Sequence, residues 1–463
     1  MMEIPKFREF VTEGKDNKFR LLIVTDEPEE AKTFHTADRL QQEAKKLGWG
    51  YYLYKLTDGY TTYQDGIRRV HNKDDKKGFV VSSKDTIAVI RGSVVRKDSW
   101  MNLISTLEKD NICCINSRYC IETCTDKYRT ALKLAEFGLK QPKTTLITNK
   151  EKALESFEKL ETEFPIILKT LRGSKGVGVL YVESKISLDS IVQLINKQDE
   201  DADLLLQEYI KTDFDVRVLV LGGKVIATMK RPVVKGDFRS NVSQGSKPKS
   251  LELTELEMEH CLKAAKAVNG LWTAVDFITS KNRDKIPPFL LEVNSSPGTE
   301  GMEEATGRNI SKDVIDHFAD KKNWVKTAEE VGYKEVVHVN PFGELIGKFD
   351  TGNSVLSVIH GEDVKINNGM VEFILDGKKV KRPLVRKYTT KIGSIRQYEE
   401  ERPVVIFDIS FAGKTYKEIE FGVDDRSSMG TEVLLTRKLM KKMNVSVNPA
   451  RIFVVTTPYS IDK

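Results

Sequence analysis

The sequence FLLEVNSSPG occupies residues 289–298, and WTAVDFI occupies residues 272–278. Both runs are apolar enough to form buried β-strands, yet they carry the polar residues Asp276, Glu292 and Asn294. Glu292 and Asn294 are two positions apart, so they project from one face of their strand. An unpaired carboxylate in a buried strand is costly, and we therefore reject the alternative of solvent-facing acidic residues on an edge strand. Two carboxylates and an amide oxygen, with no His or Cys nearby, predict a magnesium site that holds nucleotide phosphates.

A glycine-rich stretch, RGSKGVGV, lies upstream at residues 172–179, between two β-type runs. Glycine lets the backbone turn its N–H groups toward phosphate and approach it closely. Taken alone, the stretch is better explained as a hairpin turn, because it lacks the spacing of a Walker loop and no helix follows it. Lys169 lies just before it on a strand, where a cation needs a partner, and phosphate is the partner that we favour.

Three arginines, Arg217, Arg231 and Arg239, lie between the glycine-rich stretch and the acidic strands. Each one alone is most simply a member of a surface ion pair. Together, beside a metal site, they are predicted to neutralise charge that develops on a transferred phosphoryl group and on an acyl phosphate.

The N-terminal part of the chain alternates strand and helix patterns. Apolar runs at 21–27, 51–56 and 86–92 predict buried strands, and 29–47 predicts a helix. Strands that alternate with helices indicate a doubly wound α/β sheet of modest size. The polar segment 71–78 is expected to be a solvated loop.

The middle part mixes strands with two helical stretches, 126–137 and 254–267, and the second opens with Thr254 and Glu257, a capping-box pattern. The alternation in VRVLVLGGKVIATM, interrupted by two glycines, predicts a hairpin. The final part has short strands, frequent Gly and turns. We predict five segments: an N-terminal tail (1–17), an α/β domain (18–114), an α+β catalytic domain (115–320), a linker (321–334) and a mostly-β domain (335–463).

The composition limits the class of protein. Among 463 residues, 74 Lys and Arg face 68 Asp and Glu, and the net charge of +6 is too small to propose direct nucleic-acid binding. No run approaches the roughly 20 apolar residues of a membrane helix, and the charged N-terminus lacks an apolar signal core, so we expect a cytoplasmic protein without a membrane partner. Five cysteines predict reduced thiols, and the cluster at 113–124 lacks CxxC spacing, so buried small side chains are favoured over a metal or redox site.

Seven runs, in this order, resemble the ATP-grasp superfamily and most closely its RimK-type ligases, which add glutamate to the C-terminus of a small-subunit ribosomal protein. The runs are DKYRTALKLAEFGLKQPKT, ILKTLRGSKGVGV, LLQEYIK, DVRVLVLGGKVIA, KGDFRSN, AVDF and LLEVNSSPGTEGMEEATG. The resemblance covers about 115–315 and implies that 18–114 is a pre-ATP-grasp domain, although that domain matches by position only.

The resemblance also implies roles for individual residues. Lys127 and Lys169 resemble the two lysines that contact phosphate, and Asp215 resembles the ribose contact. Arg239 and Asn241 would face the phosphoryl end, while Asp276, Glu292 and Asn294 would bind two magnesium or manganese ions. The remaining nucleotide contacts would come from the glycine-rich loop and the adenine hinge, namely Gly173, Ser174, Lys175, Gly176, Gln207, Glu208, Tyr209 and Ile210.

The implied activity is an ATP-dependent ligase that phosphorylates a carboxylate and lets the amine of an amino acid attack the acyl phosphate. The resemblance implies glutamate as the amino acid and a protein acceptor, with a small-subunit ribosomal protein as the candidate. Two alternatives stay open: an ATP-binding protein that does not ligate, including one associated with a virion as the N-terminal tail weakly suggests, and a ligase with a small-molecule or carrier-protein acceptor. Such a reaction needs positioning and charge stabilisation rather than a nucleophilic Ser or Cys.

In the C-terminal part, Asp350, Thr351 and Gly352 form a DTG tripeptide between apolar strands. A carboxylate supported at a tight turn can share a proton with a second one, although DTG alone is a common turn. With ERPVVIFDI and VDDRSSMGTEVLLTRKLM downstream, the run resembles the retropepsin-like family once described as ATP-dependent zinc proteases, often encoded beside or fused to RimK-type ligases. The resemblance implies that Asp350 is catalytic, and because the chain has a single DTG, a homo-oligomer with an even number of chains.

Two residues depart from that family. Asn353 stands where a small residue usually follows DTG, and Thr436 stands where the family has glycine, so both enlarge sterically tight positions. The sequence therefore leaves two alternatives for this domain: an aspartic peptidase, or a non-catalytic module that dimerises or tethers substrate. Zinc has little support, since His338 and His360 are too few and the domain has no Cys.

Overall fold

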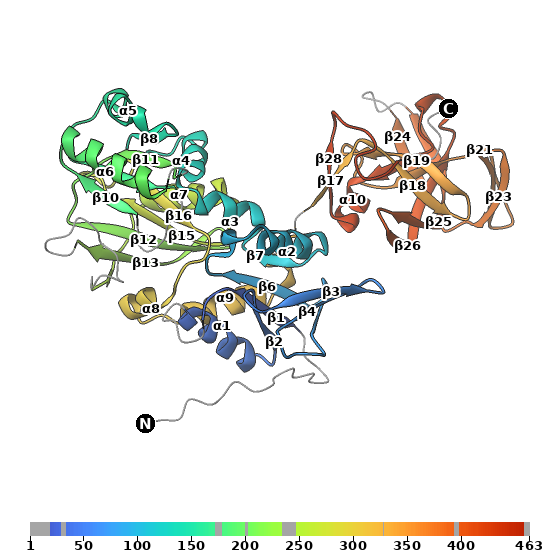
Figure 1. Cartoon of the computed structure of the whole chain (residues 1–463). Helices are drawn as coiled ribbons and strands as arrows, with labels where there is room; N and C mark the ends of the chain where they lie inside the picture. Colours follow the sequence, from blue (N-terminus) through green and yellow to red (C-terminus); the bar gives the residue numbers. More distant parts are fainter. Residues whose placement is uncertain are drawn as a thin grey trace. The chain divides into compact units, whose positions relative to one another are not determined.

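The computed structural model describes residues 19–28, 34–171, 178–199, 202–233, 247–326, 328–392 and 398–457, without the side chains of 390–392 and 398–400. The chain forms two compact units, and the first ends at Lys326 (Figure 1). No helix in the described ranges is long and apolar enough to cross a membrane.

A four-stranded parallel sheet opens the first unit, in the order β2 (Gly50–Lys55), β1 (Arg20–Thr25), β6 (Thr86–Arg91) and β7 (Cys113–Ile115). On one face, Ile23 shares a core with α1 (His35–Lys46) and α9 (Ile310–Phe318). On the other face, Leu22 shares a core with α2 (Asp98–Lys109). Helices therefore cover both faces, and the predicted doubly wound α/β domain is confirmed.

Residues 72–78 form a loop, as predicted for 71–78, and Lys73, Asp74, Lys76 and Lys77 are exposed; His71 ends a strand of a small antiparallel sheet. This sheet consists of β3 (Tyr60–Gln64), β4 (Ile67–His71) and β5 (Phe79–Val81). His71 is only 5% exposed because its ring stacks on Tyr60, with the centroids 4.6 Å apart. Asp75 accepts a hydrogen bond from the hydroxyl of Tyr52 at 2.6 Å. The predicted loop is therefore present, and the hydroxyl of Tyr52 in β2 ties it to the main sheet.

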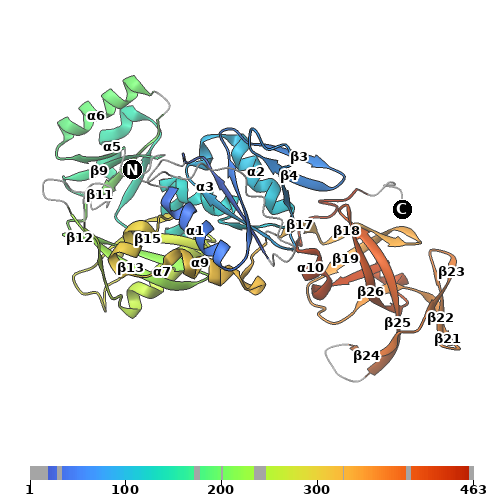
Figure 2. The same cartoon turned by 90° about the horizontal axis from the view of Figure 1, so that it is seen from below.

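The middle of the chain contains two antiparallel sheets. The first has the order β10 (Val179–Val182), β9 (Ile166–Thr170), β11 (Leu204–Glu208) and β8 (Thr144–Ile147). The helices α5 (Ala153–Leu160) and α6 (Lys185–Gln198) pack on one of its faces, where Phe157 and Leu188 join the core. Figures 1 and 2 both show this sheet beside the second one.

The second antiparallel sheet has the order β14 (Lys249–Ser250), β13 (Lys224–Pro232), β12 (Phe214–Leu221), β15 (Trp272–Ile278) and β16 (Phe289–Asn294). The helices α3 (Arg118–Thr125), α4 (Lys127–Glu136), α7 (Glu255–Ala267) and α8 (Glu300–Thr306) accompany it. The helix and capping box predicted at Thr254 are confirmed, with both capping bonds present. The glycine hairpin is confirmed as well, since Leu221 pairs with Lys224.

Cysteines in the predicted cluster lie inside this unit as thiols. Cys113, Cys114 and Cys120 are buried, and the sulfur of Cys120 lies 3.9 Å from that of Cys124. Their burial fits the interpretation of small apolar side chains.

The second unit is mostly β, as predicted. Its core is a closed barrel of six strands: β18 (Lys334–Asn340), β19 (Gly343–Asp350), β27 (Val433–Thr436), β20 (Ser357–His360), β26 (Lys414–Asp424) and β25 (Tyr398–Phe411). β25 pairs back onto β18 and closes it. The same unit also contains the strands β21 (Glu362–Asn367), β22 (Met370–Leu375), β23 (Lys378–Pro383) and β24 (Arg386–Ile392) and the helix α10 (Arg437–Met443).

The stretch expected to be a linker, 321–334, is structured at both ends. Trp324 donates to the carbonyl oxygen of Phe318 at 2.8 Å and packs on Phe19, so it belongs to the first unit. The strand β17 (Glu329–Gly332) pairs with β28 (Val445–Asn448) in the second unit. The boundary between the two units, after Lys326, falls within this stretch.

The hairpin between β12 and β13 packs against His317 of α9, and two glycine substitutions test this contact. Gly222 and Gly223 both have positive φ, 55° and 74°. A Cβ on Gly222 would lie 2.3 Å from Cε1 of His317, whereas a Cβ on Gly223 meets nothing within 4 Å. We expect Gly223→Ala to lower the free energy of unfolding by about 1 kcal/mol through backbone strain alone, and Gly222→Ala to lower it further because the imidazole must move. Urea denaturation of the two variants measures the difference, and equal losses would contradict the packing of His317.

Candidate functional site

Four of the predicted site residues lie on one face of the second antiparallel sheet, the face that does not pack on α7. They are Arg217, Asp276, Glu292 and Asn294. Val216, Val275 and Val293 alternate with them and join the core that contains Cys261 and Ala264 of α7. The strand period of two therefore sends the neighbouring polar side chains to the opposite face. Three of these residues lie side by side on neighbouring strands. Arg217 of β12 pairs with Asp276 of β15, and Asp276 pairs with Glu292 of β16.

Arg217 holds Asp276 with two parallel hydrogen bonds. Its Nε donates to Oδ1 at 2.7 Å and its terminal nitrogen donates to Oδ2 at 2.5 Å. The same terminal nitrogen lies 3.9 Å from Oε1 of Glu292. This fork geometry fixes the carboxylate of Asp276 in one orientation, which a single lysine contact would not do.

Arg231 forms a second, more deeply buried fork with Asp215. Its Nε and terminal nitrogen donate to the two oxygens of Asp215 at 2.7 and 2.6 Å, and the terminal nitrogen also lies 3.1 Å from Oδ2 of Asp276. Arg231 is 3% exposed and Asp215 is 7% exposed. Arg231 therefore orients both Asp215 and Asp276 from inside the sheet, and its fork uses one lone pair on each oxygen of Asp215. The predicted contacts of Arg231 with a phosphoryl group and of Asp215 with ribose stay predictions.

The charges of this cluster stabilise one another. Burial alone would raise the pKa of Asp276, but Arg217 and Arg231 hold it well below its usual range. Burial alone would lower the pKa of Arg231, and Asp276 and Asp215 raise it instead. Removing either partner from such a buried pair leaves an uncompensated charge, so the four side chains act as one unit.

Glu292 is the carboxylate that the arginines compensate least. Desolvation by the surrounding protein and the neighbouring charge of Asp276 raise its pKa. Its side chain is nevertheless 44% exposed. Asn294 lies on the same face, as predicted, with its amide nitrogen 3.4 Å from Oε1 of Glu292. A divalent cation would relieve the repulsion between Glu292 and Asp276.

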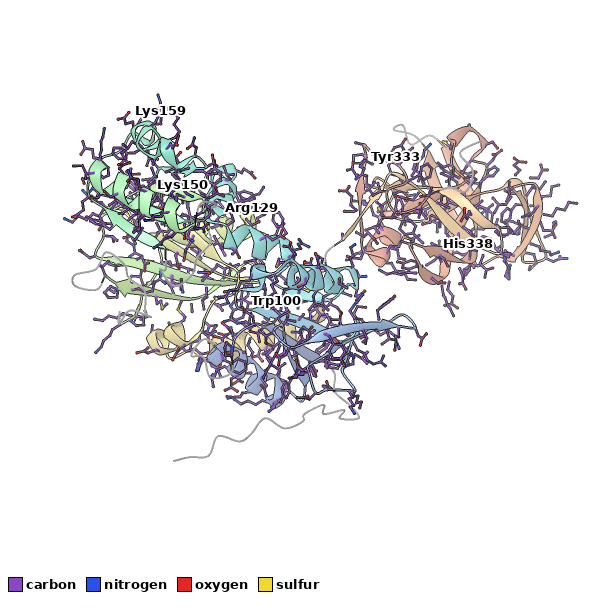
Figure 3. The ribbon with its side chains drawn as sticks, viewed as in Figure 1. Trp100, Arg129, Lys150, Lys159, Tyr333 and His338 are labelled. Atoms are coloured by element: carbon purple, nitrogen blue, oxygen red, sulfur yellow. The ribbon has the colours of Figure 1, made fainter. Side chains whose placement is uncertain are left out.

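The two predicted lysines lie together at the first antiparallel sheet. Lys127 is the first residue of α4, the helix that carries Arg129 (Figure 3). Its Nζ donates to the carbonyl oxygens of Thr170 and Leu171 at 3.1 and 3.3 Å. Lys169 on β9 donates to Oε1 of Gln207 at 2.6 Å. Burial lowers the pKa of both lysines, that of Lys169 to about 8, and the charge of Glu292 opposes the shift in each.

The predicted adenine hinge is the connection between the two antiparallel sheets. Gln207 and Glu208 end β11, and Tyr209 and Ile210 follow before β12 begins. Gln207 is 5% exposed and also donates to the hydroxyl of Thr144 at 3.0 Å, so Lys169 and Thr144 fix its amide. The ring of Tyr209 meets Tyr181 of β10 edge to face, with the centroids 5.2 Å apart.

Six predicted residues lie outside the described residues: Gly173, Ser174, Lys175, Gly176, Arg239 and Asn241. The strands that flank the glycine-rich stretch are described, and β9 pairs antiparallel with β10 across it.

In the second unit, Asp350 ends β19 and its carboxylate caps the turn that follows. Oδ1 accepts from the backbone N–H of Gly352 at 2.9 Å and of Asn353 at 3.3 Å. Both departures from the family pattern are accommodated. The amide of Asn353 donates to the carbonyl oxygen of Leu356 at 3.0 Å, and Thr436 caps α10 while its hydroxyl lies 3.3 Å from that of Ser357. Both larger side chains are therefore held by hydrogen bonds at these positions.

The histidines of this unit do not come together. His338 is exposed on β18 (Figure 3), whereas the half-buried ring of His360 accepts from the backbone N–H of Arg426 at 3.0 Å. Across the described ranges of both units, no group of three or more His, Cys, Asp and Glu side chains is arranged to hold a metal ion. The candidate site in the first unit consists of two carboxylates and an amide.

Sequence reasoning missed Asn116 and Arg91. Both lie directly at the ends of buried strands, a position that signals function in parallel sheets, but neither belongs to a recognisable motif. Asn116 donates to the carbonyl oxygens of Trp272 and Ser295, which border the metal-site strands.

Comparison with known proteins agrees with this geometry. Residues 124–318 match the family model described as a RimK-like ATP-grasp domain, and residues 330–458 match the retropepsin-like aspartic endopeptidase RimB. A probable alpha-L-glutamate ligase 2 of Pseudoalteromonas atlantica is 34% identical over 217 residues, which cover 46% of this chain and 70% of that protein. The chain belongs to the RimK-like ATP-grasp family.

Other RimK-like relatives match over the same region. The probable alpha-L-glutamate ligases of Marinomonas sp. and Psychromonas ingrahamii are each 36% identical, over 44% of this chain. The chain spans 66% and 65% of their lengths, slightly under two thirds.

Solved structures confirm the ATP-grasp fold. An ATP-grasp ligase of Chryseobacterium gregarium, solved with ADP and a leader and core peptide, has a TM-score of 0.50 at 16% identity and covers 65% of this chain and 97% of that one. The D-cycloserine synthetase DcsG has a TM-score of 0.50 at 12% identity, with coverage of 65% and 99%.

The buried fork between Arg231 and Asp215 should dominate the stability of the second sheet. We expect Arg231→Met to cost about 3–5 kcal/mol of unfolding free energy, because it leaves Asp215 buried without a partner. Adding Asp215→Asn should restore part of the loss, since the neutral amide no longer needs a counter-charge. A double-mutant cycle by chemical denaturation measures the coupling energy between the two residues. If the losses of unfolding free energy in the two single variants simply add in the double variant, Arg231 and Asp215 do not stabilise each other.

Lys169 makes nucleotide binding depend on pH. Its pKa in the free protein is about 8, and a bound polyphosphate favours the ammonium form and raises that pKa. Affinity for ATP should therefore fall as the pH rises through 8, and binding near pH 8 should take up a proton. Calorimetry in two buffers of different ionisation enthalpy measures this uptake. Lys169→Arg, which stays charged, should lose the dependence; an unchanged uptake would place the titrating group elsewhere.

Proposed function

We propose that this chain is an ATP-dependent carboxylate–amine ligase that adds glutamate to a protein acceptor through an acyl phosphate. The observation that carries the proposal is the pair of carboxylates on adjacent strands, Asp276 and Glu292, oriented by two arginine forks and electrostatically coupled to Lys127 and Lys169. Anion-binding and cation-binding groups thus meet at one place, as a metal-bound polyphosphate requires.

The reaction balances in two steps. An oxygen of the acceptor carboxylate attacks the γ-phosphorus of ATP, the bond to the bridging oxygen breaks, and ADP leaves. The amine of glutamate then attacks the acyl carbon, inorganic phosphate leaves, and the amine proton passes to solvent or to a phosphate oxygen. Both steps move negative charge without a covalent bond to the protein, so preorganised charges are what the site must supply.

The residues present suit magnesium or manganese. Glu292, Asn294 and Asp276 would hold the cation with hard oxygen ligands, and a bound cation would neutralise charge on the transferred phosphoryl group. Arg231 and Asp215 set the orientation of Asp276 from inside the sheet. Arg217, with 19% of its side chain exposed, lies nearest to where that charge would develop.

Glutamate as the amino acid is supported by the names of the relatives, each described as a probable alpha-L-glutamate ligase. The protein acceptor, with a small-subunit ribosomal protein as the candidate, is proposed from the resemblance to RimK-type ligases. The cytoplasmic location is proposed from the five free cysteines, which fit a reducing compartment.

Ligation can be tested with Glu292→Gln against the matched control Glu304→Gln, an exposed residue of α8. With ATP, magnesium, glutamate and ribosomal proteins, the wild-type chain and Glu304→Gln should add glutamyl residues stepwise to one protein. Glu292→Gln should slow this at least about a hundredfold, because the cation loses a charged ligand. Intact-mass spectrometry reads the products. ATP binding without any mass change or ADP release in the wild type would favour a non-ligating ATP-binding protein.

A second activity is favoured by the geometry around Asp350. Its carboxylate is held by two backbone N–H groups at a turn, and we propose that two chains bring two such carboxylates together as an aspartic peptidase that trims the glutamyl product.

Asp350→Asn tests this activity, with Asp376→Asn, at the exposed β22–β23 turn, as the control. We expect products with longer glutamyl extensions from Asp350→Asn and unchanged products from the control, because a neutral amide cannot activate water. Mass spectra over time give the length distribution. Identical distributions for all three proteins would instead favour a module that dimerises or tethers substrate.

A further inference from the structure

The loop that follows the candidate metal ligand Asn294 is held by the N-terminal sheet. Its alternate residues each contact one side chain of that part of the chain. The carbonyl oxygen of Ser295 accepts from Nδ2 of Asn116 at 2.6 Å, and that of Pro297 accepts from Arg91 at 2.7 Å. The backbone N–H of Thr299 donates to the hydroxyl of Thr36 at 3.1 Å.

Asn116 makes the most extensive of these contacts. It is fully buried, at 0% exposure, directly after β7. Besides Ser295, its Nδ2 donates to the carbonyl oxygen of Trp272 at 2.7 Å. Its Oδ1 accepts from the backbone N–H groups of Leu271 and Trp272 at 2.7 and 3.2 Å. Two donors and two lone pairs are the full capacity of a primary amide, so the side chain has a single orientation here.

These bonds join the two strands that carry the candidate metal ligands. Trp272 begins β15, four residues before Asp276, and Ser295 follows Asn294 at the end of β16. The two strands are antiparallel, and Ala274 pairs with Asn294, so the beginning of β15 lies beside the end of β16. A side chain that bonds both ends fixes how far Asn294 lies from Asp276.

We propose that Asn116 is a positioning residue for the metal site, with Arg91 as a second support for the same loop. The inference rests on the proposed function, because it takes Asp276, Glu292 and Asn294 as the ligands. Magnesium accepts little deviation from octahedral geometry, so a small displacement of Asn294 weakens binding of the cation. The N-terminal sheet then contributes to catalysis without touching the reacting atoms.

An ordinary packing contact would also cost stability when removed, so stability alone does not test this role. Asn72 supplies a matched control. Its amide donates to the carbonyl oxygen of Leu53 at 2.7 Å and accepts from the N–H of Lys55 at 2.9 Å, within the same α/β domain. None of its bonds reaches the loop after Asn294.

The experiment compares Asn116→Asp with Asn72→Asp in the full chain. Each change keeps the shape of the side chain and replaces its donors with an oxygen, which then faces backbone carbonyl oxygens. Mn²⁺ is titrated into the protein saturated with ADP, and electron paramagnetic resonance measures free Mn²⁺. We expect Asn116→Asp to bind Mn²⁺ about ten- to hundredfold more weakly, as for other residues that orient metal ligands, and Asn72→Asp to bind it as the wild type does.

If Asn116→Asp fails to fold, Arg91→Met provides the same test, and Mn²⁺ affinity should fall in the same direction because Pro297 loses its bond. A folded Asn116→Asp, or Arg91→Met in its place, that binds Mn²⁺ like the wild type would overturn the inference and leave the proposed function intact. A wild-type chain that binds ADP but no Mn²⁺ would contradict the proposed function, and this inference with it.

Discussion

The alternating series Asp215, Arg231, Asp276, Arg217 is the interaction on which the rest of the site depends. Its members lie on three adjacent strands and are linked by hydrogen bonds of 2.5–2.7 Å and one contact of 3.1 Å. Buried charges are stable only when paired, so the series imposes the register of β12, β13 and β15. Glu292 stands at its exposed end with a surplus of negative charge. The sheet thereby places the carboxylate of Glu292 where a cation can neutralise it. The buried ion pairs beneath it are costly to separate, so the position of this carboxylate is fixed.

The second unit also contains a buried carboxylate, but backbone N–H groups rather than arginines stabilise it. Glu335 is buried at 0% exposure, and its carboxylate accepts from the backbone N–H groups of Gly332, Val454 and Thr456. This ties the start of the barrel to the end of the described chain. The turn at Asp350 uses the same device at an accessible place, where two N–H groups hold a carboxylate and leave one oxygen without a bond from that turn. A fixed, half-exposed carboxylate is what the retropepsin-like match leads one to expect there.

The sequence predicted the fold well because its strongest signals are local. The capping box at Thr254, the two-glycine hairpin and the alternation around Glu292 all describe neighbours within a few residues. It predicted less well what depends on pairing between distant strands. Nothing in the sequence marks Arg231 and Asp215 as partners, so their fork could not be predicted. The role of Asn116 could not be predicted either, because its hydrogen-bond partners lie more than 150 residues away in the sequence. The burial of His71 also depends on a neighbouring strand, since its ring stacks on Tyr60.

The most direct test of the account is a crystal structure of the chain with ADP and Mn²⁺, using anomalous scattering to locate the metal. The account predicts an anomalous peak within about 2.0–2.3 Å of carboxylate oxygens of Glu292 and Asp276 and of the amide oxygen of Asn294, with the forks of Arg217 and Arg231 intact. An anomalous peak away from these three side chains, or a nucleotide bound with Glu292 unliganded, would contradict it.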